Sequence, residues 1–467
     1  MIDNQVLKLL KKSKTFKWRA SKPVFLISFT KVLMKKVLIL TYYWPPGGGA
    51  GVQRWLKFVK YLREFGWEPI VYTAENGEMP VIDNSLEKDI PKGISILKTK
   101  IWEPYSFYKA FIGRKKDDKI NASFLSENKK TSLTEKISVW IRGNFFIPDA
   151  RKYWIKPSVN YLKDHLEKNP VDAIISSGPP HTMHLIALGL KKQFPNIKWV
   201  ADFRDPWTNI DFYEELMLSS SSDKKHKRLE SEVLSKADAI ISIGKGMNED
   251  FKKIYTKQPE KFHVITNGYD EDDIYKGPLE KDKKFSIAHI GTLVKSRNPE
   301  TLWKVLKQLV TENENFKKDL EIKLVGKVDF FVKEQLGKYG LTTFVNKIDY
   351  LPHNEVIKEQ QKTKVLLLLV NQTKNAKSIV TGKIFEYLAA QVPILAIGPP
   401  KGDLADILEQ TKSGLISDFN DEDQLKKNIL DLYNNRKFIN FDKNEIARYS
   451  RRELTKELSG VLTALSR

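Results

Sequence analysis

The sequence predicts an α/β protein with two doubly wound domains, each built on a parallel sheet, that face each other across a cleft. Three observations carry this prediction. Short apolar runs alternate with helical patterns from Val37 onward, the same alternation restarts after Gly268, and 467 residues exceed what one ordinary core supports. Strands separated by helices form parallel sheets that are buried on both faces.

The first half contains five buried strand runs, at residues 37–41, 69–73, 173–176, 199–202 and 239–243. A proline- and glycine-rich loop at residues 45–49 follows the first run. Residues 52–65 then show helical spacing, with Val52, Leu56, Val59 and Leu62 on one face. Residues 101–148 mix aromatic residues with lysines. We interpret them as an insertion, either an acceptor-side or membrane-facing segment or simply a mobile loop.

The second half repeats this pattern with strand runs at residues 285–290, 320–325, 365–370 and 393–397. The first two runs end at Gly291 and Gly326, and a helix is expected from about Pro299 to Leu309. In doubly wound sheets, ligands bind outside the carboxyl ends of the strands. The loops after these strands are therefore the expected place for a ligand.

These patterns define the expected domains. Residues 34–270 should form an N-terminal Rossmann-like domain, residues 271–440 a C-terminal one, and residues 441–467 a C-terminal helix that packs back on the N-terminal domain. Residues 1–33 are basic and poorly patterned, and Met34 directly precedes the first strand. We interpret them as a disordered extension or a mis-assigned start, with a basic, aromatic interfacial anchor as the alternative.

Composition limits the partners. The net charge of +21, from 79 basic and 58 acidic residues, would suit nucleic acid, an anionic membrane surface or a polyanionic substrate, but a lysine-rich solvated surface explains it equally well. The absence of any arginine-rich arm, zinc-finger spacing or aromatic RNA-binding motif argues against nucleic acid. The absence of cysteine excludes disulfides and thiolate metal sites. With no apolar run of ~18–20 residues, we expect a cytoplasmic protein, with peripheral contact at the inner face of the membrane left open.

The strongest local motif is the run SIVTGKIFEYLAA at residues 378–390. Thr381 and Gly382 begin a helix, and Lys383 and Glu386 share a face near its start. A helix N-terminus offers free N–H groups and partial positive charge, which suit a diphosphate, and Glu386 could accept both hydroxyls of a ribose. The alternative is an ordinary amphipathic helix with a surface Lys–Glu pair.

This segment, with its continuation to Asp403, resembles the donor-binding helix of the retaining glycosyltransferases of family 4, also called group 1. The run YWPPGGGAGVQR at residues 43–54 resembles that family's N-terminal glycine loop. VADFRDPW at 200–207, ADAIIS at 237–242 and VITNGYD at 264–270 are similar to further landmarks, in the expected order. The resemblance implies the GT-B fold, a nucleotide-diphosphate sugar held mainly by the C-terminal domain, and an acceptor held by the N-terminal one. We expect no cofactor and no metal.

The resemblance also implies individual site residues. The donor would be bound by Gly47, Gly48, Gly49, Gly291, Arg297, Gly326, Leu351, Thr381, Gly382, Lys383, Ile384 and Glu386. Arg297 and Lys383 would stabilise the leaving diphosphate and so count as catalytic. On the acceptor side, the catalytic candidates are His181 and Asp205, although a lone histidine is as often structural.

Several positions depart from the family pattern. The family's donor helix carries two glutamates eight positions apart, and here the partner of Glu386 is Ser378. The usual arginine after the first strand of the C-terminal domain is Thr292, for which Arg297 could substitute. The usual N-domain histidine aligns nearer Ser177 than His181. These departures suggest a divergent branch of the family.

The predicted function is a hexosyltransferase-like glycosyltransferase that moves a sugar, with retention, from a nucleotide-diphosphate sugar to a cell-envelope glycan, such as lipopolysaccharide, or to a lipid-linked acceptor. Three alternatives stay open. The first is a non-catalytic protein that binds a glycan or scaffolds an assembly. The second is a nucleotide-sugar epimerase, which would share the two-domain fold. A nucleic-acid-binding protein ranks last.

Overall fold

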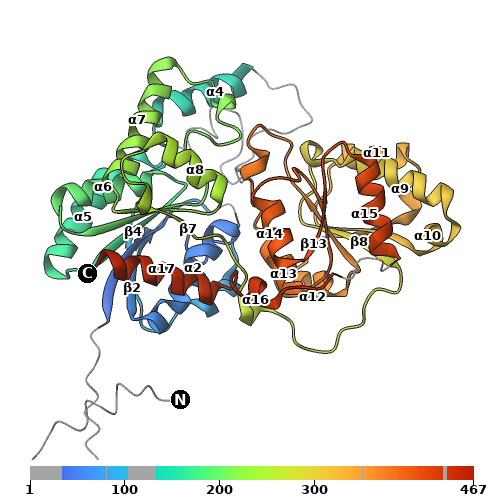
Figure 1. Cartoon of the computed structure of the whole chain (residues 1–467). Coiled ribbons are helices and arrows are strands. Elements are labelled where there is room, and N and C mark those ends of the chain that lie inside the picture. Colours follow the sequence, from blue (N-terminus) through green and yellow to red (C-terminus); the bar gives the residue numbers. More distant parts are fainter. Residues whose placement is uncertain (1–33, 80, 104–132, 350, 435–438, 467) are drawn as a thin grey trace, which may run out of the picture. The chain divides into compact units, whose positions relative to one another are not determined.

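Two parallel sheets organise the chain (Figure 1). The computed structural model describes residues 34–79, 81–103, 133–349, 351–434 and 439–466. The first sheet has the strand order β3-β2-β1-β4-β5-β6-β7. Its strands are β1 (Lys35–Leu40), β2 (Trp67–Ala74), β3 (Ser95–Thr99), β4 (Ala173–Gly178), β5 (Lys198–Phe203), β6 (Ala239–Ser242) and β7 (Phe262–Val264).

The second sheet repeats this winding in the order β10-β9-β8-β11-β12-β13. Its strands are β8 (Phe285–Ile290), β9 (Leu320–Val325), β10 (Val345–Ile348), β11 (Val365–Leu369), β12 (Ile394–Ile397) and β13 (Gly414–Ser417). In both sheets the strand order reverses beside the first strand, between β1 and β4 and between β8 and β11. Such switch points are where doubly wound sheets bind ligands.

Helices connect the strands in each half. In the first half they are α2 (Ala50–Leu62), α4 (Leu133–Phe145), α5 (Ile155–Lys168), α6 (Thr182–Gln193), α7 (Ser220–Lys236) and α8 (Lys245–Ile254). In the second half they are α9 (Glu300–Glu312), α10 (Glu314–Asp319), α11 (Phe330–Lys338), α12 (His353–Lys362), α13 (Lys383–Ala390), α14 (Asp403–Thr411) and α15 (Glu422–Tyr433), followed by α16 (Lys443–Ala447) and α17 (Arg451–Leu465).

Each sheet is buried on both faces by apolar side chains. In β11, Leu367 belongs to the hydrophobic cluster on one face, and Leu366 and Leu368 belong to the cluster on the other. The same alternation in β1 sends Leu38 to one face and Val37 to the other. Because successive side chains of a strand point to opposite faces, a continuous apolar run is what a doubly covered strand requires.

The last helix packs on the first half of the chain. Leu454, Leu458 and Leu462 of α17 lie in the same hydrophobic cluster as Val52 and Leu56 of α2, and Figure 1 shows α17, in red, beside α2, in blue. The three leucines are spaced four residues apart, so they form one stripe of the helix. The chain therefore crosses from the first half to the second and returns.

The fold class predicted from the sequence is confirmed, and all nine predicted strand runs are strands. The pattern missed β3, β7, β10 and β13, which are the four edge strands of the two sheets. Their side chains are mostly half-buried or exposed, so they lack the continuous apolar run of a central strand. The predicted helix at 441–467 is two helices, α16 and α17. The prediction for residues 1–33, and that for residues 104–132 of the expected insertion, lie outside the described residues.

Candidate functional site

Two glycines end neighbouring strands of the second sheet and lie beside Lys383. Gly291 follows β8 with φ +118°, and Gly326 follows β9 with φ +104°, a backbone conformation that favours glycine. A Cβ on Gly291 would lie 2.8 Å from Lys383 Nζ, and a Cβ on Gly326 would lie 3.0 Å from the Gly291 carbonyl oxygen. Gly291 thus leaves the room that the lysine occupies, and Gly326 leaves room for the Gly291 backbone, so three predicted site residues lie close together.

Lys383 is the first residue of α13, whose start was predicted from the sequence. Gly382 is the N-cap, and no side chain caps the helix. The N–H of Ile384 donates to the Thr381 carbonyl at 3.2 Å. The N–H groups of Gly382 and Lys383 come before this bond, and the first N–H groups of a helix are the ones that can meet a phosphate. The Thr381 hydroxyl is buried and has no hydrogen-bond partner within the described part of the chain.

Arg297 approaches the same edge of the sheet from the loop after β8. Its Nε donates to Oδ1 of Asn371 at 2.6 Å. Asn371 follows β11, which pairs with β8, so this hydrogen bond spans the loops that leave the two strands of the switch point. Arg297 is therefore held at the place where a doubly wound sheet binds its ligand.

Glu386 lies one turn into α13, with an exposed side chain. Gln360 of α12 is buried, with 2% of its surface exposed, and its Nε2 donates to Glu386 Oε2 at 3.0 Å. A carboxylate has about four lone-pair sites, so one such bond leaves acceptor capacity for hydroxyl groups. The Gln360 amide thus holds the Glu386 carboxylate in place while it stays exposed to solvent.

The two remaining predicted donor residues of this half lie nearby in different settings. The Ile384 side chain is fully buried in the hydrophobic core, so only its backbone could face a ligand. Leu351, just beyond β10, is half-buried and packs against the same hydrophobic cluster. An apolar side chain at a sheet edge is suited to contact a planar ring rather than a phosphate.

The cations of this site carry unneutralised positive charge. Among the described residues, no carboxylate lies within ion-pair distance of Lys383 or Arg297. Burial and the neighbouring Arg297 guanidinium lower the pKa of Lys383 to about 8, while Glu386 acts to raise it. Two uncompensated cations beside a helix N-terminus, with a fixed carboxylate one turn away, form a site for an anion that also carries hydroxyl groups.

Family models match most of the chain. Residues 270–465 match the model described as Glycosyl transferases group 1. Residues 120–273 match the model described as Glycosyltransferase Family 4. The chain belongs to the group 1 glycosyltransferases. A search of curated proteins found no relative of this sequence.

Solved structures show that this glycosyltransferase has the GT-B fold. A glycosyltransferase from Rickettsia africae ESF-5 aligns over 92% of this chain and 98% of its own, with a TM-score of 0.59 and 13% identity. The apo lipopolysaccharide outer core galactosyltransferase WaaB aligns over 92% and 99%, with a TM-score of 0.56 and 12% identity. A protein described as a UDP-N-acetylglucosamine 2-epimerase from Listeria monocytogenes aligns over 91% and 95%, with a TM-score of 0.51 and 12% identity. At these identities the likeness establishes the fold alone.

The predicted glycine loop of this glycosyltransferase lies at the switch point of the first sheet. A Cβ on Gly47 would lie 2.9 Å from Met79 Sδ, and one on Gly48 would lie 2.9 Å from the Asp83 Cβ. These two glycines therefore allow close packing against Met79 and Asp83. Gly49, with φ +89°, is the N-cap of α2 and has open space around it, so of the three it is the one placed to meet a ligand.

The predicted acceptor-side residues, His181 and Asp205, lie in contrasting environments. His181 is buried and stacks on Trp207 at 4.4 Å between ring centroids. Burial and the nearby His184 keep its pKa well below the usual value, so its ring is neutral. Asp205 is exposed to solvent. The surrounding protein removes part of the water around its carboxyl group and so raises its pKa to about 6, which still leaves mostly carboxylate at neutral pH. Within the described residues, no recorded contact joins either side chain to Lys383 or Arg297.

Ser378, which stands where the family has a glutamate, lies against α8. A Cβ on Gly246 would lie 2.2 Å from the Ser378 Oγ. Nearby, both carboxylate oxygens of Asp403 accept from the Gly246 N–H, at 2.9 and 3.2 Å. Ser378 is thus packed tightly against the backbone of Gly246, which has no side chain.

Sequence reasoning missed three residues that hold this site together: Asn371, Gln360 and His289. His289 Nε2 lies 3.5 Å from Lys383 Nζ. A signal existed for two of them, because Asn371 directly follows an apolar strand run and His289 is a polar residue inside another one. Gln360 gave none, since a glutamine on a helix is usually solvated.

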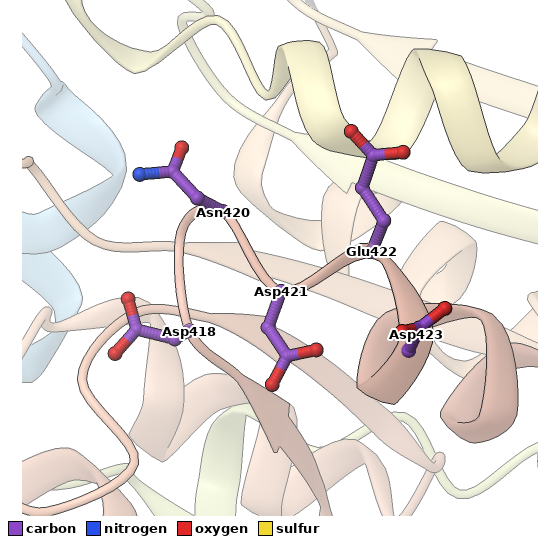
Figure 2. A pocket seen from close by; sticks show the side chains of 5 residues that line it. All are labelled: Asp418, Asn420, Asp421, Glu422 and Asp423. Atoms are coloured by element: carbon purple, nitrogen blue, oxygen red, sulfur yellow. The ribbon is translucent and has the colours of Figure 1, made fainter.

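Two acidic clusters could suggest other sites. A pocket of about 610 Å³ is lined by Asp418, Asn420, Asp421, Glu422 and Asp423 (Figure 2). Its carboxylates would repel an anionic donor, so it does not compete with the site described above.

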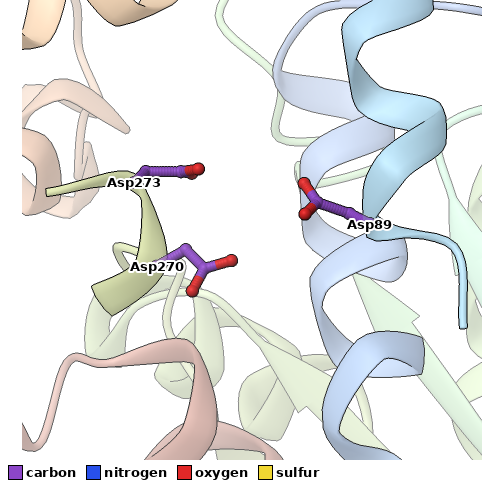
Figure 3. Close-up of side chains that lie close together, drawn as sticks. All are labelled: Asp89, Asp270 and Asp273. Carbon is purple, nitrogen blue, oxygen red and sulfur yellow. The ribbon is translucent and has the colours of Figure 1, made fainter.

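The second cluster joins Asp89, Asp270 and Asp273, whose carboxylates lie close enough together to hold a cation (Figure 3). Lys57 Nζ lies among them, at 2.7, 2.6 and 3.0 Å. An ammonium group already supplies the positive charge that a metal would bring, which indicates a structural cluster.

No helix within the described residues is long and apolar enough to cross a membrane.

Proposed function

We propose that this glycosyltransferase transfers a sugar from a nucleotide-diphosphate sugar to a cell-envelope glycan or a lipid-linked acceptor. The observation that carries the proposal is the pair of uncompensated cations, Lys383 and Arg297, at the switch point of the second sheet. A diphosphate leaving group develops negative charge as the bond to the sugar breaks, and fixed cations stabilise it without a metal. WaaB, which shares the fold, is an outer core galactosyltransferase and motivates the envelope acceptor.

Each group of the proposed site has a distinct role. Lys383, Arg297 and the first N–H groups of α13 would bind the diphosphate, while Glu386 would accept hydrogen bonds from the ribose. Gly291 and Gly326 would let the donor approach the sheet edge, with Leu351 near the base and Gly49 facing the donor from the first half. His181 and Asp205 would serve the acceptor side. Retention at the anomeric carbon, with the diphosphate assisting acceptor deprotonation, is proposed from the family resemblance alone.

The test is a thermal-shift panel of UDP, GDP, ADP and their common sugar conjugates, without added metal. A ligand that binds only the folded state raises the melting temperature, so one nucleotide series should stabilise the protein. The Glu386→Ala variant should lose this stabilisation, whereas Glu422→Ala, an exposed glutamate in the first turn of α15, should keep it. EDTA should change neither result.

The other outcomes favour other functions. A well-folded protein that no nucleotide stabilises would support the non-catalytic reading, which the serine at position 378 motivates. Conversion of a donor into its epimer without an acceptor would support the epimerase, whose fold this chain shares. If the stabilising donor is turned over only with an acceptor, NMR of the product decides the stereochemistry, and an inverted linkage would refute retention.

A membrane contact is proposed separately, from the net charge of +21. Sedimentation with vesicles containing anionic phosphatidylglycerol, compared with neutral phosphatidylcholine vesicles, tests it. If equal amounts of protein sediment with the two kinds of vesicle, the proposed membrane contact is wrong.

A further inference from the structure

Three buried cations of this chain are neutralised by carboxylates. Lys57 contacts three aspartates, and Arg54 forms a fully buried pair with Asp202 at 2.7 Å. Lys323, 4% exposed, contacts Asp282 at 2.6 Å and Glu359 at 3.2 Å. Pairing of this kind is what a buried charge ordinarily requires.

Arg297 and Lys383 are held differently, by uncharged acceptors. The Arg297 guanidinium donates to the amide oxygen of Asn371 at 2.6 Å. The Lys383 ammonium lies 3.5 Å from Nε2 of His289. His289 is 2% exposed, and its burial beside Lys383 lowers its pKa to about 3. The imidazole is therefore neutral, and with its hydrogen on Nδ1 its Nε2 can accept from the lysine.

One acceptor lies on a strand of the switch point, and the other lies in the loop directly after the neighbouring strand. His289 is the last residue but one of β8, and Asn371 lies two residues beyond the end of β11. The two strands pair directly, with Ala288 opposite Leu366. A side chain carried by a central strand is held more precisely than one on a free loop.

We propose that Asn371 and His289 are positioning residues of the donor site, which fix Arg297 and Lys383 without neutralising them, so that both cations keep their charge for a diphosphate. The inference rests on the proposed function, because it assumes that a diphosphate binds there. A carboxylate at either position would orient the cation equally well, but it would form an ion pair that competes with the ligand. A neutral acceptor supplies the geometry and leaves the charge available.

The decisive variant is Asn371→Asp, which keeps the shape and the acceptor oxygen and adds one negative charge. The control is Asn444→Asp, which makes the same change at an exposed position in α16. Inorganic pyrophosphate and the nucleoside diphosphate found by the thermal-shift panel are the probes, titrated calorimetrically at low and high salt. Asn371→Asp should keep its melting temperature and lose about tenfold or more in affinity for both probes, as expected for a competing charge-assisted bond. The loss should exceed that of Asn371→Ala.

His289 is tested through the protonation of Lys383. His289→Gln retains a neutral acceptor, whereas His289→Leu removes it. We expect His289→Gln to retain, and His289→Leu to lose, most of the affinity for pyrophosphate, and only the leucine variant should move the basic limb of the binding pH profile. A purely structural role would change the melting temperature of both variants without this difference.

The outcomes separate the two proposals. If the wild-type protein binds neither pyrophosphate nor any nucleoside diphosphate, the proposed donor site is wrong and this inference falls with it. If the wild-type protein binds the probes and Asn371→Asp binds them equally well, the donor site stands and the inference is wrong. The inference is also wrong, and the donor site again stands, if His289→Gln and His289→Leu bind pyrophosphate equally well.

Discussion

Lys383 illustrates how much a single residue depends on its surroundings. In the sequence it is one of many lysines, and only its position at the start of a helix distinguished it. In the structure its ammonium group lies over Gly291, beside the neutral ring of His289 and near a second cation, Arg297. Its nearest favourable charge, Glu386, forms no ion pair with it. Burial of a charge without such a pair is costly, so a ligand that supplies negative charge readily explains this lysine.

Removing either cation should abolish most turnover. Lys383→Ala and Arg297→Ala should each lower kcat about 10²–10³-fold, because each removes a fixed charge that stabilises the leaving group. Lys377→Ala, an exposed lysine close by in sequence, is the control and should retain activity. Initial rates with saturating donor measure the effect. A near-normal kcat/KM in Lys383→Ala would refute the catalytic role.

Activity should depend on pH through Lys383. Its protonated form binds the diphosphate, and the pKa in the free protein is lowered to about 8. As pH rises through this value the cation is lost, so kcat/KM for the donor should fall above about pH 8 with a slope of one proton. In Lys383→Arg the guanidinium stays charged at every accessible pH, and the limb should disappear. A wild-type profile that is flat to pH 10 would contradict this assignment.

At the scale of elements, charge fastens α2 to the segment after β7. Lys57 and Lys60 of α2 reach Asp270, and Lys57 also reaches Asp89 and Asp273. Lys57 is 2% exposed, so its ion pairs are shielded from water. The cluster links helix α2 to the segment through which the chain passes toward the second sheet.

Removing this central charge should destabilise the fold. Lys57→Met leaves three carboxylates with less positive charge among them, and breaking a buried ion pair in this way costs about 3–5 kcal/mol. Lys227→Met, which breaks an exposed i,i+4 pair with Asp223, should cost less than about 0.5 kcal/mol. Urea unfolding at neutral pH measures both. Equal midpoints for the two variants would show that the Lys57 cluster does not stabilise the protein.

At the scale of the whole molecule, two segments connect the two halves of the chain, one around Tyr269 and one around Tyr449. These two connecting segments contact each other. The Tyr269 N–H donates to the Tyr449 carbonyl at 3.1 Å, and the Arg451 N–H donates to the Tyr269 carbonyl at 2.8 Å. Between them, Gly268 has no room for a side chain, because a Cβ there would lie 2.2 Å from the Tyr449 carbonyl oxygen. Glycine is required by this close approach.

A methyl group at position 268 should therefore push the two connecting segments apart. Gly268→Ala should destabilise the protein by about 1–3 kcal/mol, the usual cost of overpacking. Gly460→Ala is a matched control in α17, where a Cβ meets nothing within 4 Å, and it should stabilise by about 0.5–1 kcal/mol, since alanine favours a helix. Urea midpoints compare them. If Gly268→Ala is as stable as the wild-type protein, the backbones are not in obligatory contact.

How much the sequence predicts differs between the fold and the site. Central strands such as β1 and β11 were predicted because both their faces are buried, which forces a continuous apolar run. The edge strands β3 and β10 were missed because one side of each faces solvent, where no such run is needed. The start of α13 was predicted from Thr381 and Gly382, and the family follows from motifs that persist along the chain.

The sequence by itself determined the elements, the two-sheet fold class and the family, because strand and helix periodicity and short motifs are local properties of the chain. Only the tertiary structure brought Gly291, Lys383 and Asn371, which lie up to 92 residues apart in the sequence, to one edge of one sheet. It also packed Gly47 against Met79 and Gly48 against Asp83, and buried His181 on Trp207. The physical reason is the strand order: β8 and β11 become neighbours when the sheet reverses direction, and no local pattern records that pairing.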